Sequence, residues 1–253
     1  MQIRHIWVII QKINRFAEIG VNGMQTVDQH NSGVPDENRN SAENNYVPPK
    51  RKPIYSFFKR MFDIILSIIA LILLSPVFLV ISILIKAEDG GKIIYKSTRL
   101  TKDGKEFGMY KFRSMIPNAE KLKDSLMDQN EVKGPAFKMK DDPRITKIGK
   151  FIRKTSIDEL PQLVNILIGD MTIIGPRPPL PQEVAQYTPY QLHRLDVKTG
   201  LACYHEVEGR SETTDFDEWV EQDLRYIRER SLWTDIKIIF KLFKVVITGK
   251  GAA

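Results

Sequence analysis

The sequence IILSIIALILLSPVFLVISILI occupies positions 64–85, and none of its 22 side chains carries a charge. As one helix it would be long enough to cross the hydrocarbon core of a membrane, which is about 30 Å thick. Ser75 and Pro76 stand at its centre. Because proline lacks an amide hydrogen and clashes with the carbonyl group four residues earlier, we predict a break in the helix at this point.

Each half of the broken segment has at most 11 residues, about 16 Å of helix, which is half a bilayer. Basic residues flank both ends, whereas a spanning helix carries its positive excess on one side. The flanking basic residues are Arg51, Lys52, Lys59 and Arg60 before the segment and Lys86 and Lys92 after it. Two topologies stay open on these residues: a re-entrant helix that enters and leaves by the same face, and a kinked full span.

The residues before this segment are of two kinds. Positions 1–20 carry apolar residues at helical spacing, which is typical of an amphipathic helix that lies in a membrane interface or packs on the protein. The apolar run is too short for a signal peptide, and no small-residue cleavage site follows it. Positions 21–56 are rich in Asn, Glu, Ser and Pro, and we predict a flexible linker there.

The residues after the segment predict an α+β fold that is mostly helical. Asp103-Gly104 lies between two strand-like runs and predicts a small β-hairpin. The expected strands are 93–95, 107–112 and 171–174, and the expected helices are 118–127, 147–154, 156–168, 187–195, 216–228 and 235–247. We therefore place one domain at 57–253, with a membrane part at 57–86 and a catalytic part at 87–253.

The last predicted helix carries Lys237, Lys241 and Lys244 on one stripe and apolar residues elsewhere. This is the pattern of an amphipathic helix in a membrane interface, and a helix packed on the domain would also produce it.

Composition limits the function further. With 42% hydrophobic and 27% charged residues, the chain is neither disordered overall nor disulfide-rich. The single cysteine, Cys203, excludes an internal disulfide and a cysteine-built zinc site, and the four histidines lack metal-ligand spacing. The net charge of +7 is concentrated at 96–154, where 16 Lys and Arg face 8 Asp and Glu. Such a field favours nucleic acid, anionic lipid headgroups or phosphorylated small molecules.

The segment Thr155-Ser-Ile-Asp-Glu-Leu-Pro-Gln162 is the sharpest candidate site. Ser156 and Glu159 have the spacing of a capping box, which would place Asp158 in the first turn of a helix. Amide groups and the helix dipole would keep such a carboxylate ionised, able to attack phosphorus, while Glu159 would hold a divalent cation or handle a proton. Ordinary helix capping would give the same pattern.

Basic residues with some context supply candidate phosphate ligands. Lys111 and Arg113 alternate on a predicted strand and suit phosphate oxygens, although a solvated strand face would look alike. Arg177 projects from Gly175-Pro-Arg-Pro-Pro179, where three prolines fix the backbone and lower the entropy cost of gripping an anion. Arg99, Arg153 and Gly209-Arg210 are weaker candidates by themselves. No Walker-type or dinucleotide-binding glycine loop occurs.

Together these motifs resemble the bacterial sugar transferases, the monotopic phosphoglycosyl transferases that act on polyprenyl phosphate. The resemblance runs from about Phe57 to the C-terminus. The motifs that carry it, in order, are KFRSM at 111–115, DPRIT at 142–146, KTSIDELPQL at 154–163, NIL at 165–167, GDM at 169–171 and GPRP at 175–178.

The resemblance implies transfer of a sugar-1-phosphate from a nucleotide diphosphate sugar to polyprenyl phosphate, the first membrane step of exopolysaccharide assembly. It assigns Asp158 as the nucleophile of a covalent phosphosugar intermediate, Glu159 as its partner, and Mg²⁺ as the cofactor, with Asp158 as a ligand. It also implies that Ser75-Pro76 breaks a re-entrant helix, and that Arg153, Arg177 and Arg210 contact phosphate or nucleotide. The enzyme would lie in the bacterial inner membrane, with its catalytic part on the cytoplasmic face.

One stretch departs from the resemblance. The family often reads PGITGWAQV where this chain reads TGLACYHEV at 199–207, which bears on sugar or nucleotide preference. A membrane-tethered module that binds nucleotide sugars or recruits assembly partners without catalysis is the alternative. A nucleic-acid partner is not expected, because no helix-turn-helix or base-stacking motif occurs. Membrane lipids are expected partners, and the residues do not decide whether the protein is a homo-oligomer.

Overall fold

The computed structural model describes residues 46–119, 121–122, 125–126, 139, 141–208 and 215–248, without the side chains of 246–248. The predicted helix at 1–20, most of the predicted linker at 21–56, and Arg210 lie outside the described residues. The described part is mostly helical with two small sheets, so the predicted α+β class is confirmed.

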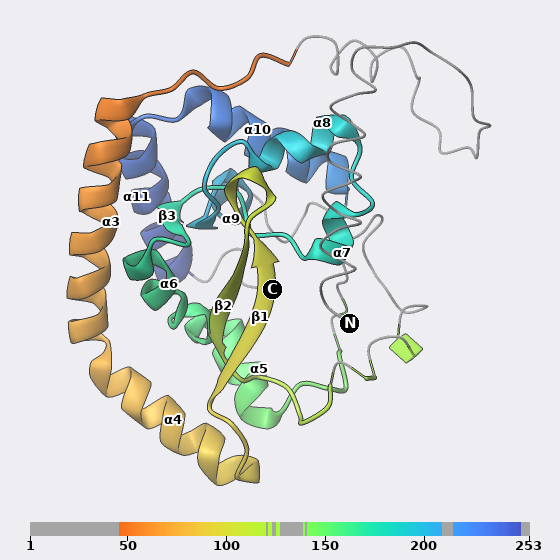
Figure 1. Ribbon diagram of the computed structural model, residues 1–253. Helices are drawn as coiled ribbons and strands as arrows, with labels where there is room; N and C mark the ends of the chain where they lie inside the picture. The colour runs from red at the N-terminus through yellow and green to blue at the C-terminus, as the bar shows by residue number, and fades with distance from the viewer. Residues whose placement is uncertain are drawn as a thin grey trace.

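A bent pair of helices forms one edge of the molecule (Figure 1). The first is α3, Pro53–Leu73, which begins inside the segment predicted as a linker, and the second is α4, Ser75–Asp89. Their axes differ by 61°. Pro76 falls in the first turn of α4, where its missing amide hydrogen costs no helical bond. The predicted break is confirmed.

Hydropathy and length together single out this pair. Among the described residues, no single helix is long and apolar enough to cross a membrane, whereas α3 and α4 pass that test jointly.

The contacts of α3 are inverted relative to a helix on the surface of a soluble protein. Its polar residues face the rest of the chain, and Asp63 and Ser67 are buried. Asp63 accepts hydrogen bonds from Thr172 Oγ1 at 2.7 Å and from the Ile173 amide at 3.0 Å. Most of its apolar residues are exposed, among them Phe57, Phe62, Ile65, Ile69, Ile72 and Leu73.

The predicted hairpin is confirmed, and it packs inside the angle between α3 and α4. Strand β1, Ile94–Leu100, pairs antiparallel with β2, Glu106–Phe112. Asp103 and Gly104 both adopt positive φ, 58° and 71°, as a tight hairpin turn requires. Phe107 and Met109 of β2 pack with α3, and Phe112 packs against Ile81 and Ile85 of α4.

The region predicted as one helix at 156–168 differs from expectation. Helix α5, Lys147–Lys154, forms as predicted, and a 3₁₀ turn, Ile157–Glu159, precedes α6, Gln162–Ile168. Ser156 has φ of 55° and its side chain caps nothing, so the predicted capping box is wrong. An N-cap needs extended backbone, but Ser156 takes the left-handed conformation that ends α5.

The C-terminal half packs helices around a second, parallel sheet. Strand β3, Thr172–Ile174, pairs with β4, Gly200–Ala202. The helices are α7, Pro181–Val184, α8, Pro189–Leu192, the 3₁₀ turn His193–Leu195, α9, Tyr204–Glu208, α10, Phe216–Glu229, and α11, Leu232–Thr248. The predicted strand at 171–174 and helices at 187–195, 216–228 and 235–247 are thereby confirmed, whereas β4 was not predicted.

One predicted helix, at 118–127, is not regular where it is described. Residues 118–119 and 121–122 form turns, and 125–126 belong to a 3₁₀ stretch. Asn118 has φ of 64°, which an α-helix does not accommodate.

A buried carboxylate joins the start of α3 to the C-terminal helices. Asp235 of α11 accepts hydrogen bonds from Tyr55 and from Tyr226 of α10 at 2.9 and 2.8 Å, and Lys59 lies 2.8 Å from it. These contacts fix α3 against α11, beside which it lies in Figure 1.

Candidate active site

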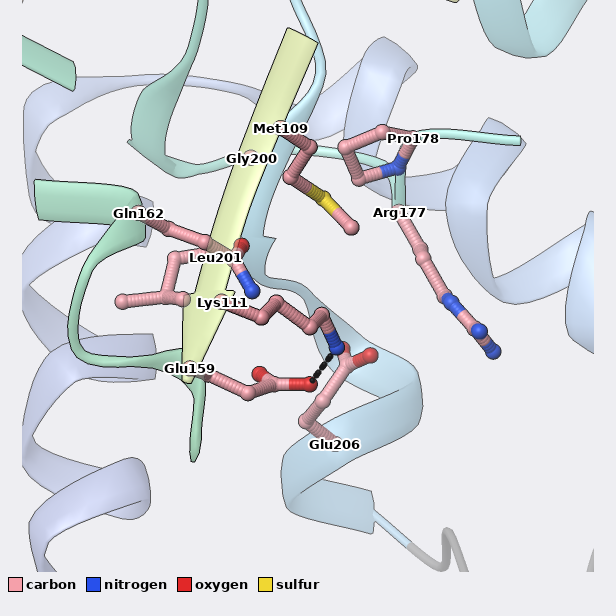
Figure 2. Close-up of a pocket in the computed structure, with 9 residues that line it drawn as sticks. All are labelled: Met109, Lys111, Glu159, Gln162, Arg177, Pro178, Gly200, Leu201 and Glu206. Carbon is pink, nitrogen blue, oxygen red and sulfur yellow. Dashed lines mark hydrogen bonds and ion pairs between the residues drawn. The ribbon is translucent and has the colours of Figure 1, made fainter. Parts of the chain in front are cut away.

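A pocket opens where six segments of the fold meet (Figure 2). Strand β2, the 3₁₀ turn with α6, the loop after β3, strand β4 and helix α9 each contribute to its wall. The lining residues are Met109, Lys111, Glu159, Gln162, Arg177, Pro178, Gly200, Leu201 and Glu206. Lys111, Glu159 and Arg177 were predicted as site residues, and the fold brings them together from positions far apart in the sequence.

An ion pair marks one wall of the pocket. The Lys111 ammonium lies 2.8 Å from Oε1 of Glu159, and about a quarter of each side chain is exposed. Lys111 reaches this position because it follows Phe107 and Met109 on the same face of β2. Asp158 directly precedes Glu159 and is buried, and it does not itself line the pocket. The predicted nucleophile and its partner therefore lie side by side with different access to solvent.

Arg177 stands on the opposite wall, on the rigid loop that the prolines predict. The Pro176 carbonyl accepts a hydrogen bond from the Gly200 amide at 2.8 Å. The Pro178 carbonyl accepts one from Arg99 at 3.1 Å. With the backbone held on both sides, the exposed Arg177 side chain lines the pocket, and its guanidinium points away from Lys111 and Glu159 (Figure 2).

This chain matches a known family across most of its length. The model of the bacterial sugar transferase family matches residues 54–249. The chain belongs to the bacterial sugar transferase family. The matched region contains α3 except for its first residue, all of α4 and every residue of the pocket.

The share of each relative's length that aligns with this chain varies. It is 48% identical over 196 residues to galactosyl transferase CpsE of Streptococcus agalactiae, covering 77% of this chain and 43% of that protein. It is 41% identical over 190 residues to the UDP-glucose:undecaprenyl-phosphate glucose-1-phosphate transferase of Escherichia coli K12, covering 72% and 38%. It is 36% identical over 205 residues to exopolysaccharide production protein ExoY of Sinorhizobium fredii, covering 79% and 90%. The chain thus spans about two fifths of the first two relatives and nearly all of the third.

Two other predicted basic residues of this sugar transferase, Arg113 and Arg153, do not line the pocket. Arg113 forms an ion pair with Asp89 at the end of α4, with Nη1 2.7 Å from Oδ2, and this contact lowers the pKa of Asp89 to about 2. Arg153 is exposed in the last turn of α5. Arg210 lies outside the described residues.

Sequence reasoning missed Glu206, a second carboxylate of the pocket. Its Oε2 accepts a hydrogen bond from the Cys203 amide at 2.7 Å, at the start of α9. The spacing Cys203-x-x-Glu206 is that of a helix start, and this was the signal available. Glu206 falls in the stretch that departs from the family pattern, so that departure reaches the pocket wall.

Two carboxylates of the pocket are oxygen donors of the type that magnesium prefers. Within the described ranges, no cluster of three or more His, Cys, Asp and Glu side chains could hold a metal alone. Mg²⁺ usually binds through one or two carboxylates together with substrate phosphates, so a dedicated cluster is not required. Glu159 and Glu206 supply two carboxylates, and Asp158 adjoins the first.

Proposed function

We propose that this sugar transferase moves a sugar-1-phosphate from a nucleotide diphosphate sugar to polyprenyl (undecaprenyl) phosphate, the first membrane step of exopolysaccharide assembly. The observation that carries the proposal is the pocket that Lys111, Glu159 and Arg177 line, with the buried Asp158 next to Glu159 in the chain. The relatives support the substrates, because one is named for UDP-glucose and undecaprenyl phosphate and another for exopolysaccharide production.

The proposed chemistry has two displacements at one phosphorus atom. A carboxylate oxygen of Asp158 attacks the phosphorus that bears the sugar, and the bridging P–O bond breaks as nucleoside monophosphate leaves. A phosphate oxygen of the lipid then attacks the same phosphorus and releases Asp158. One carboxylate thus serves both half-reactions, which gives ping-pong kinetics.

The remaining pocket groups would stabilise charge around the phosphoryl groups. Arg177 can form bidentate hydrogen bonds to phosphate oxygens, and Lys111 supplies a second cation that its ion pair with Glu159 holds in place. Mg²⁺, held by Asp158 and Glu159, would neutralise part of the diphosphate charge when bound. Glu159 also lies where it can accept or return a proton.

We further propose that α3 and α4 enter the cytoplasmic leaflet of the bacterial inner membrane as a re-entrant pair. Support comes from the inverted amphipathicity of α3, whose exposed apolar side chains form a patch that water would disfavour. With a bend of 61°, both ends of the pair stay on one side of the membrane when the two helices enter the leaflet obliquely. The acceptor phosphate of a polyprenyl lipid would then reach the pocket without leaving the interface.

Helix α11 would lie in the membrane interface beside this pair. Phe240 and Phe243 are exposed on it, and Lys237, Lys241 and Lys244 are exposed as well. Apolar side chains would enter the headgroup boundary while the lysines meet anionic lipid. Lys241 also reaches Glu208 at 2.7 Å, which ties this face to α9 near the pocket.

The decisive experiment measures the leaving nucleotide. Purified protein in detergent is incubated with undecaprenyl phosphate and a panel of UDP-sugars, and the released nucleotide is separated by chromatography. Release of UMP that depends on protein and acceptor is expected for one or more sugars. Release of UDP would mean transfer of the sugar alone and would exclude the proposal. No release with any donor would favour the non-catalytic binding module.

A further inference from the structure

The Arg177 side chain rests on an aromatic ring. Its guanidinium carbon lies 5.2 Å from the centre of the Trp219 indole ring, which comes from α10. A ring attracts a cation through its quadrupole and leaves the positive charge in place. The other pocket cation is held differently, because Lys111 is paired with the negative charge of Glu159.

Side chains from two other elements pack against the Trp219 indole ring. The His205 ring of α9 lies nearly parallel to the indole, with centres 4.4 Å apart and planes 17° apart. The Arg194 guanidinium lies 5.4 Å from the indole centre and forms a buried ion pair with Asp223 at 2.7 Å. These contacts leave the indole little freedom to rotate, so it is a fixed platform.

A second cation lies close to Arg177 on the inner side of the loop. Arg99 donates a hydrogen bond to the Pro178 carbonyl, and its Nε atom is buried without a hydrogen-bond partner. Burial, and next the charge of Arg177, lower the pKa of Arg99 to about 10. Two guanidinium groups thus raise the positive potential at this wall, and an anion between pocket and loop would relieve their repulsion.

We propose that Trp219 is a positioning residue that holds the Arg177 guanidinium at the pocket wall for the diphosphate of the donor. This inference rests on the proposed function. A carboxylate in the same place would fix Arg177 equally well but would compete with phosphate for its charge. The indole orients the guanidinium without neutralising its charge, so the full charge of Arg177 remains available to bind the diphosphate of the donor.

The test is calorimetric titration of the full chain in detergent with UDP and, separately, with uridine. Trp219→Leu is expected to weaken UDP binding about fivefold, through the loss of one cation–π contact on an exposed side chain. Trp219→Phe keeps a ring with a weaker attraction and is expected to lose about threefold. Uridine, which carries no phosphate, is expected to bind all three proteins equally.

A double-mutant cycle separates positioning from a general structural role. In an Arg177→Gln background, Trp219→Leu or Trp219→Phe is expected to cause no further loss of UDP affinity. Trp233→Leu is the matched control, because Lys237 lies 5.4 Å from that ring and away from the pocket. If Trp219→Leu does not fold, as thermal unfolding will reveal, the Trp219→Phe cycle provides the same comparison.

The outcomes are distinct. Additive losses in the cycle, or unchanged UDP affinity in the Trp219 variants, would overturn the positioning role and leave the proposed function standing. Absence of UDP binding by the unaltered protein, alongside no UMP release, would overturn both.

Discussion

The Ser75 hydroxyl donates a hydrogen bond to the Ile72 carbonyl oxygen, 2.8 Å away, at the bend between α3 and α4. A break in a helix frees carbonyl groups that hydrocarbon cannot satisfy, and this bond satisfies one of them. Leu74, between the two helices, keeps its amide bonded to the Ala70 carbonyl at 2.8 Å. At the bend, the Ile72 carbonyl and the Leu74 amide therefore both have hydrogen-bond partners within the chain. A backbone segment inside a membrane leaflet requires such internal partners.

The first prediction concerns topology. Single cysteines at Arg51 and Lys92, both exposed, should both resist an impermeant thiol reagent applied outside intact cells. Replacing Ser75-Pro76 by Ala-Leu restores a continuous apolar helix and should expose one of them. Native Cys203 is fully buried and adds no background. Labelling of only one cysteine in the otherwise unaltered chain would favour a kinked span.

These two positions suit the structure better than their neighbours do. Tyr55 bonds to Asp235, so a cysteine there would loosen the contact between α3 and α11. A side chain at Gly91 would meet the Arg113 guanidinium, with its Cβ 2.6 Å from Nη1.

The second prediction concerns the nucleophile. Asp158→Asn should abolish turnover, since an amide can neither attack phosphorus nor carry the intermediate. The matched control is Asp103→Asn, an exposed position in the hairpin turn where Asn-Gly is equally favoured. UMP release is the measurement, with mass spectrometry of the unaltered protein to detect the phosphosugar adduct. Near-normal turnover by folded Asp158→Asn would refute the covalent mechanism.

The third prediction separates catalysis from stability at the ion pair. Glu159→Gln should lower kcat about 100-fold or more, as expected for loss of a group that acts on transition-state charge. The unfolding free energy should change by only about 0–1 kcal/mol, because the pair with Lys111 is partly exposed. Activity is measured across a magnesium titration. Retention of both rate and magnesium dependence would limit Glu159 to a structural role.

The fourth prediction concerns acid stability. Hydrogen bonds from Arg144 lower the pKa of Asp142, and both side chains are buried. A lowered carboxyl pKa stabilises the fold above the unfolded value of about 3.9, and this contribution is lost as pH falls toward the folded pKa. Asp142→Asn should therefore cost about 3 kcal/mol at pH 7, because it removes the negative charge with which the buried Arg144 is paired.

Thermal unfolding across pH measures this effect. The stability difference between Asp142→Asn and the unaltered chain should be constant from pH 7 to pH 5 and shrink below about pH 4. The control is Asp141→Asn, a change at the exposed neighbouring position. Its free energy of unfolding should equal that of the unaltered chain across the same pH range. A difference that is independent of pH would show that the charge of Asp142 does not stabilise the fold.

Local signals in the sequence determined several parts of this protein. The break at Pro76 follows from a missing amide hydrogen, and the turn at Asp103-Gly104 follows from residues that tolerate positive φ. Helices α5 and α10 follow from periodicity. Each of these signals lies within a single turn or a single helix, so no distant partner is needed to read it.

The composition of the pocket was decided by the tertiary structure. Glu159 meets Lys111 from 48 positions away, Arg113 turns to Asp89 instead of the pocket, and Trp219 supplies the platform under Arg177. Ser156 looked like a helix cap, yet it takes a left-handed conformation because α5 ends just before it. A local pattern states which charges a segment carries. Which opposite charge or ring each one meets depends on how distant segments pack, and that arrangement exists only in the folded chain.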